Sequence, residues 1–159
     1  MVTSKDIQTL NEFLENRGVN YVLTGTAALF YHGLLPENTE VHDIDIIVLT
    51  TDETRLALQA MFKELEKLSG CQYENEHYTQ QVYIFKVGGN DIKVNAFEGD
   101  LVGIEYPKCR TMIIDGVSIR VHDALDVLKA KLSLHRKKDA DFCFKLINQL
   151  SSMFLCSKK

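Results

Sequence analysis

Two aspartates, Asp43 and Asp45, stand one residue apart at the start of an otherwise apolar run that ends at Leu49. Residues i and i+2 of a strand project from the same face, so a strand here would present two carboxylates side by side. Such a pair can hold one Mg²⁺ or bridge two ions, because Mg²⁺ prefers carboxylate, phosphate and water oxygens. Alternating Asp and Ile is also typical of a strand that merely exposes one polar face. The pair therefore needs supporting context.

That context is Gly25-Thr26, which lies between the short apolar run 21–23 and the helix-like run 27–31. Free backbone N–H groups between a strand and a helix can bind a phosphate. Gly25 lets the backbone approach closely, and the Thr26 hydroxyl can donate to an oxygen. A tight turn at Gly25 with an N-cap at Thr26 is the simpler interpretation. A phosphate-binding turn followed by a carboxylate pair on the next strand nevertheless suits a metal-bound triphosphate.

The elements that must position these residues follow from periodicity and turn signals. Helical spacing predicts a first helix from an N-cap at Ser4 to Gly18, and a later one from Thr51 or Asp52 to Leu68. The run 42–49 alternates and then becomes continuously apolar, which predicts an interior strand with one exposed end.

Two hairpins are predicted downstream. Strand-like runs at 81–87 and 91–97 are joined by Gly88-Gly89-Asn90, and runs at 110–114 and 117–121 are joined by Asp115-Gly116. Two helices close the chain. The first follows an Asp123 cap and has an apolar face of Leu125, Leu128 and Leu132. The second has an apolar face of Phe142, Leu146 and Leu150.

This order predicts one α/β (α+β) domain over residues 1–159, with a mixed β-sheet flanked by helices and a C-terminal helical pair. Its core would span about 1–122 and its helical tail 123–155. Hydrophobic residues make up 45% and charged residues 25% of the chain, as in ordinary globular domains.

Bulk properties narrow the class of function. A net charge of −4 argues against broad nucleic-acid binding, although the basic cluster around Lys131 can still bind phosphates. No apolar run approaches the roughly 18 residues typical of a membrane span, and the polar N-terminus lacks the apolar core of a secretory signal. We therefore expect a cytoplasmic protein, with its four cysteines reduced.

The stretch from Tyr21 to Leu49, with Gly-Thr-Ala-Ala, Tyr-His-Gly and Asp-Ile-Asp-Ile, resembles the nucleotidyltransferase superfamily. The signature of that superfamily is Gly-(Gly/Ser), a helix, then Asp-x-Asp. The small bacterial AbiEii-like and minimal nucleotidyltransferases are the most similar groups. A second matching stretch starts with Leu-Lys-Ala-Lys-Leu at 128–132 and continues with Arg-Lys-Lys-Asp-Ala-Asp at 136–141.

The resemblance implies a nucleotidyltransferase-like fold and a Mg²⁺-dependent reaction on an NTP. The Gly25-Thr26 turn would hold the β and γ phosphates, Lys131 would reach the nucleotide, and Asp43 and Asp45 would bind Mg²⁺. A third carboxylate, on a later strand beside the first, would bind a second ion and help to deprotonate the attacking hydroxyl.

The chain departs from that pattern where the third carboxylate should stand. Asn95 occupies the expected position, and an amide cannot serve as a general base. Asp91 shares a strand face with Asn95 and is the alternative ligand, and Glu98 is another nearby acid. The segment 39–42 is Thr-Glu-Val-His, where the family usually has Arg-x-Thr.

Three functions remain open. The first is transfer of a nucleoside monophosphate from an NTP to a hydroxyl of a protein, nucleic acid or small molecule, with Asn95 or Asp91 completing the site. The second is a catalytically weakened relative that acts as a nucleotide-binding or regulatory partner, for example in a toxin–antitoxin or phage-defence pair. The third is a hydrolase that uses the carboxylates as an acid–base pair, against which the Gly25-Thr26 turn argues. The short chain suggests that the acceptor is recruited with a partner protein.

Overall fold

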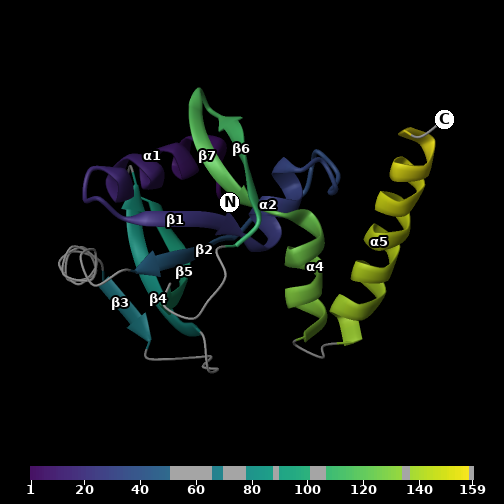
Figure 1. Ribbon diagram of the computed structural model, residues 1–159. Helices are drawn as coiled ribbons and strands as arrows, with labels where there is room; N and C mark the ends of the chain where they lie inside the picture. The colour runs from purple at the N-terminus through teal and green to yellow at the C-terminus, as the bar shows by residue number, and fades with distance from the viewer. Residues whose placement is uncertain (51–65, 70–77, 88–89, 101–106, 134–136, 158–159) are drawn as a thin grey trace.

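The computed structural model is a mixed α+β fold built on one seven-stranded sheet (Figure 1). It describes residues 1–50, 66–69, 78–87, 90–100, 107–133 and 137–157. The elements are α1 (Ser4–Glu15), β1 (Asn20–Thr24), α2 (Gly25–Tyr31), β2 (Asp43–Thr50), β3 (Glu66–Ser69), β4 (Tyr78–Val87), β5 (Asn90–Asp100), β6 (Cys109–Ile114), β7 (Val117–His122), α4 (Ala124–Ser133) and α5 (Lys137–Ser157). Within these ranges, no helix has both the length and the apolarity needed to cross a membrane.

The strand order is β3-β4-β5-β2-β1-β7-β6, so β2 lies at the centre, as the continuous apolar run predicted. It pairs antiparallel with β1 and parallel with β5. Ile44, Ile46 and Val48 are at most 1% exposed and belong to the main core. The alternate residues of β2 face the other side of the sheet, which is where the two aspartates lie.

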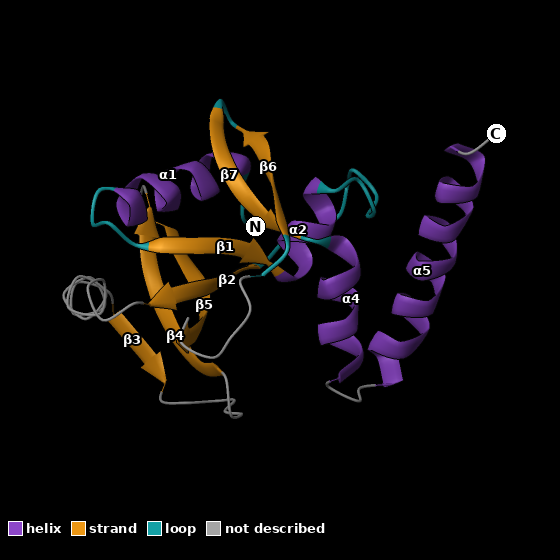
Figure 2. Cartoon of the chain, viewed as in Figure 1, coloured by secondary structure: helices purple, strands orange, loops and turns teal. Residues whose placement is uncertain are grey.

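Helix α1 lies against the sheet (Figure 2). Its apolar side packs into the main core, with Phe13 against Phe85 of β4. The predicted N-cap at Ser4 is wrong by one residue. Thr3 has an extended backbone and accepts from the Asp6 N–H, while the Asp6 carboxylate accepts from the Thr3 N–H, which forms a capping box. Ser4 is therefore the first helical residue.

Both predicted hairpins are confirmed. Strands β4 and β5 pair antiparallel up to the Val87–Asn90 pair, and β6 and β7 pair up to Ile114–Val117. The second turn consists of Asp115 and Gly116, with φ values of 49° and 81°. Two positive φ values are the requirement of a type I′ turn, which Asp-Gly satisfies well.

The helix predicted to end at Leu68 is wrong over its last residues. Glu66–Ser69 forms strand β3, which pairs antiparallel with β4, so sheet pairing prevails there over helical spacing. The remainder of that predicted helix, residues 51–65, lies outside the described residues.

Helix α4 begins at the predicted cap, since the Asp123 carboxylate accepts from the Asp126 N–H at 3.3 Å. Its predicted apolar face is partly wrong, because Leu125 is 47% exposed. The buried residues of α4 are Val127 and Leu128, which are 1% and 0% exposed. The helix packs against α2 and α5.

Helix α5 lies beside α4 at one end of the molecule (Figure 1). Phe142, predicted to face the core, is 37% exposed, whereas Cys143 and Leu146 are 0% and 4% exposed. At its start, the buried face of α5 is therefore shifted by one residue, from Phe142 to Cys143. The division into a core to about residue 122 and a tail from 123 stays a prediction.

Candidate active site

The two aspartates lie on the face of β2 opposite its core isoleucines. Asp43 is the first residue of the strand, and its side chain is 41% exposed. Asp45 pairs with Thr24 on β1 and Asn95 on β5, and its carboxyl group is held between those two neighbouring strands. Asp45 is therefore paired with a strand on both sides, whereas Asp43 is paired only with Lys93 of β5.

Asn95 lies directly beside Asp45. In the parallel pairing of β2 with β5, these two residues occupy the same level, so their side chains share a face. The Asn95 Nδ2 donates to Asp45 Oδ1 at 2.7 Å. The structure thus brings Asn95 to the carboxylate pair, at the position where the resemblance to the superfamily implies a third carboxylate.

Gly25 closes the other side of the Asp45 carboxylate. It has a φ of 67°, and a Cβ added there would collide with Asp45 Oδ2 and lie 2.8 Å from Asp45 Cγ. Glycine is therefore required for two reasons, namely the left-handed backbone and the close approach. One carboxylate oxygen meets the Asn95 amide and the other meets the backbone at Gly25.

Thr26 and Lys131 meet behind this turn. The Lys131 Nζ of α4 donates to the Thr26 Oγ1 of α2 at 3.4 Å, across 105 residues of sequence. Both side chains are half-buried. The structure therefore brings all three predicted nucleotide-binding residues, Gly25, Thr26 and Lys131, to the same turn.

The electrostatic setting of Asp45 combines opposing effects. Burial is the main cause that raises the pKa of its carboxyl group, and the charge of Asp43 raises it further. The hydrogen bond from Asn95 and the charges of Lys131 and Lys93 act the other way and favour the ionised form. A buried carboxylate beside a second one is stabilised by any cation that binds between them.

Lys93 is a site residue that the sequence reasoning missed. Its Nζ lies 4.0 Å from Asp43 Oδ2, and it pairs with Asp43 in the register of β2 and β5. Strand alternation puts Lys93 on the same face as Asn95. The signal that would have identified it, the parallel pairing of β5 with β2, is not visible in the local pattern.

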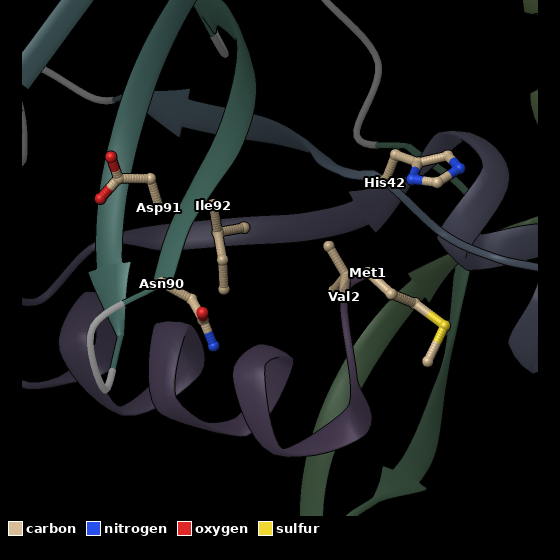
Figure 3. A pocket seen from close by; sticks show the side chains of 6 residues that line it. All are labelled: Met1, Val2, His42, Asn90, Asp91 and Ile92. Atoms are coloured by element: carbon tan, nitrogen blue, oxygen red, sulfur yellow. The ribbon is translucent and has the colours of Figure 1, made fainter.

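Asp91 is not brought to the pair. It lies two positions before Lys93, which is level with Asp43, and four positions before Asn95, or about 13 Å along the strand. Asp91 lines a shallow hollow with His42 and the N-terminal residues, and its carboxyl group points away from His42 (Figure 3).

A second polar pair, also missed, lies one strand further along the same face. The Thr24 Oγ1 and the His122 Nδ1 of β7 are 2.9 Å apart and buried. The His32 Nε2 donates to the His122 carbonyl at 2.7 Å, while the His32 backbone N–H caps α2 through Ala28. His122 thus contacts the residue before α2 and the residue that ends it, which fixes the helix on either side.

The donor set at the pair fits one Mg²⁺. Two carboxylates two positions apart on β2 supply oxygen ligands of the kind that this ion prefers, whereas the Asn95 amide turns its Nδ2 toward Asp45. In the described part of the chain, no group of three or more His, Cys, Asp or Glu side chains could hold a metal ion.

Neither a known protein family nor a curated protein sequence matches the chain. Among solved structures, the chain is similar to TM1012 of Thermotoga maritima, a proposed nucleotidyltransferase, with 24% identity over 94% of this chain and 96% of that one, and a TM-score of 0.53. Two Helicobacter pylori structures also match. JHP933 has 14% identity over 79% of this chain and 53% of its own, with a TM-score of 0.43. The other, a proposed nucleotidyltransferase, has 13% identity over 79% and 55%, with a TM-score of 0.45. The likeness to TM1012 shows that the chain shares the fold of that protein, a mixed α+β fold as predicted.

Proposed function

We propose that this chain binds an NTP with Mg²⁺ and transfers its nucleoside monophosphate to a hydroxyl acceptor. The observation that carries the proposal is the Asp45 carboxylate, held between the Gly25 backbone and the Asn95 amide with Asp43 beside it. The sheet fold alone would not argue for this function, since one fold hosts many.

The residues of the site would have separate roles in binding the triphosphate and the metal ion. The backbone at Gly25, the Thr26 hydroxyl and the Lys131 ammonium bind and orient the triphosphate. Asp43 and Asp45 hold the metal ion, and Asn95 orients Asp45 through its hydrogen bond. A bound Mg²⁺ supplies positive charge that stabilises the phosphate oxygens during displacement.

In the transfer itself, the acceptor oxygen would form a bond to the α-phosphorus as the bond to the bridging oxygen breaks and pyrophosphate leaves. The hydroxyl proton would go to water, because Asp43 and Asp45 would hold the metal ion and the Asn95 amide cannot take a proton. Transfer should therefore be slow compared with an enzyme that has a carboxylate at this position.

Titration calorimetry of ATP, GTP, CTP and UTP, with and without Mg²⁺, tests the proposal. We expect Mg²⁺-dependent binding of at least one nucleotide, lost in Asp43→Ala. Asp91→Ala is the matched control and should bind normally, because Asp91 lies away from the pair. Absence of binding to all four nucleotides would refute the proposal.

Asn95 also favours a second candidate, a weakened relative that keeps nucleotide binding and acts on a protein partner, as in a toxin–antitoxin or phage-defence pair. The test is transfer of label from NTP to any acceptor by the purified protein. Transfer that Asp43→Ala abolishes would eliminate this candidate. Label transfer gained only in Asn95→Asp would support it.

Both candidates place the chain in the cytoplasm, where NTPs and Mg²⁺ are abundant. Both also call for a partner or acceptor that brings its own recognition surface. A hydrolase that uses the carboxylates as an acid–base pair without a nucleotide would have no use for the Gly25-Thr26 turn or for the Lys131 contact with it.

A further inference from the structure

The site contains two positive side chains as well as two negative ones. Lys93 lies 4.0 Å from Asp43, and Lys131 lies 3.4 Å from the Thr26 hydroxyl. Both lysines favour the ionised form of Asp45. The carboxylate pair thus has two lysine ammonium groups near it.

The Asn95 side of the pair is poorly suited to a second divalent ion. The Asn95 Nδ2 points its hydrogens at Asp45 Oδ1, so the positive end of the amide dipole faces the space between the two side chains. The amide also brings no negative charge, and Mg²⁺ sites rely on carboxylates and phosphates. A second ion would have to bind here without a protein carboxylate of its own.

Lys93 is placed to supply the missing charge. The register of β2 and β5 puts it level with Asp43, next to the level of Asn95 and on the same face. Its side chain is 41% exposed, and half-exposed ion pairs of this kind contribute little to stability. The ammonium can therefore leave Asp43 for a phosphate oxygen at small cost.

We propose that Lys93 takes the place of the second metal ion, so that this chain binds its nucleotide with one divalent ion and one lysine. The inference rests on the proposed nucleotide-binding function. It assigns Lys93 and Asn95 as a matched pair, in which the lysine compensates for the carboxylate that the amide lacks.

Counting bound ions tests the first consequence. Mn²⁺ binding, followed by electron paramagnetic resonance with a non-hydrolysable NTP analogue, should give one ion per wild-type complex. The Asn95→Asp/Lys93→Gln double variant, which supplies the carboxylate and removes the competing ammonium, should bind two. Two ions in the wild type would overturn the inference while leaving the proposed function intact.

The single variant Lys93→Gln tests the second consequence through effects of opposite sign. Without nucleotide, Mn²⁺ should bind on the order of 3- to 10-fold more tightly, because a positive charge near the carboxylates is gone. With Mn²⁺ present, the analogue should bind on the order of 3- to 10-fold more weakly, because a phosphate partner is lost. A purely structural role would not move the two affinities in opposite directions.

Lys86→Gln, an exposed lysine on the neighbouring strand β4, is the matched control and should change neither affinity. Unchanged affinities in Lys93→Gln, or changes in the same direction, would overturn the inference. Failure of the wild type to bind the analogue at all would refute both the inference and the proposed function. Lys93→Arg, which keeps the charge, should restore most of the nucleotide affinity.

Discussion

The two faces of strand β2 differ most at its start, because one face carries Asp43 and Asp45 before the buried Ile47, whereas the other is apolar there. On one face, Ile44, Ile46 and Val48 are at most 1% exposed and pack into the main core. On the other, Asp43 and Asp45 meet an amide, a glycine turn and two lysines.

The difference between the two faces indicates which residues contribute to stability and which contribute to binding. The apolar face gains free energy from burial, which depends on volume and shape. The polar face lowers the free energy of unfolding, because a carboxylate is held out of water beside a second one. Substitutions on the two faces should therefore differ in sign as well as in size.

The largest effect is expected on the apolar face. Ile46→Ala removes a side chain that is 1% exposed and should lower the free energy of unfolding by about 2–5 kcal/mol, measured by urea denaturation. Ile113→Ala, at a side chain that is 70% exposed, is the control and should stay within about 0.5 kcal/mol. Equal costs for the two would break the comparison between the faces.

Next in size is the turn that closes the polar face. Gly25→Ala must put a Cβ into Asp45 in a left-handed backbone, and should cost about 2 kcal/mol or more and abolish divalent-ion binding. Gly33→Ala has a similar φ of 77° with nothing within 4 Å, so it should cost only about 1 kcal/mol. Calorimetric unfolding and Mn²⁺ titration of both variants measure the difference, and similar values for the two would show that the close approach is unimportant.

Asp45→Asn should stabilise the metal-free protein at pH 7 by about 1 kcal/mol while abolishing metal binding, because it removes a buried charge. Asp43→Asn, at a half-exposed side chain, should change stability by less than about 0.5 kcal/mol. Thermal unfolding with and without Mg²⁺ separates the two effects. A loss of stability in metal-free Asp45→Asn would contradict the account of the polar face.

The same carboxylate predicts a pH dependence. The folded state holds the proton of Asp45 more tightly than the unfolded chain, whose pKa is near 3.8. Stability from this group is therefore present at low pH and lost as pH rises from about 3.8 through the raised pKa. Unfolding of wild type and Asp45→Asn across that range should show the wild type falling relative to the variant, most strongly without Mg²⁺.

The smallest expected effect comes from His122. Burial lowers its pKa from 6.5, so the stability that it contributes is present above pH 6.5 and lost as pH falls through the lowered pKa. His122→Gln should remove this loss of stability at low pH. His42→Gln is the control and should not remove it, because the His42 side chain is 70% exposed. An unchanged pH profile in His122→Gln would mean that the Thr24 contact does not depend on the neutral ring.

Local patterns predicted much of this molecule. The hairpins were predicted because their turns demand particular residues, as Asp115-Gly116 does with two positive φ values. The faces of α4 and α5 were predicted less well, since Leu125 and Phe142 are exposed. Helical spacing gives the width of an apolar stripe, but neighbouring elements decide which of its edges is covered.

The sequence by itself determined the carboxylate pair of Asp43 and Asp45 and the position of Gly25, because strand alternation and glycine backbone freedom are properties of the local chain. Only the tertiary structure decided what surrounds the pair. The parallel pairing of β5 with β2 places Asn95 against Asp45 and Lys93 against Asp43. That register joins segments 50 residues apart, and it is set by packing across the whole sheet rather than by either segment alone.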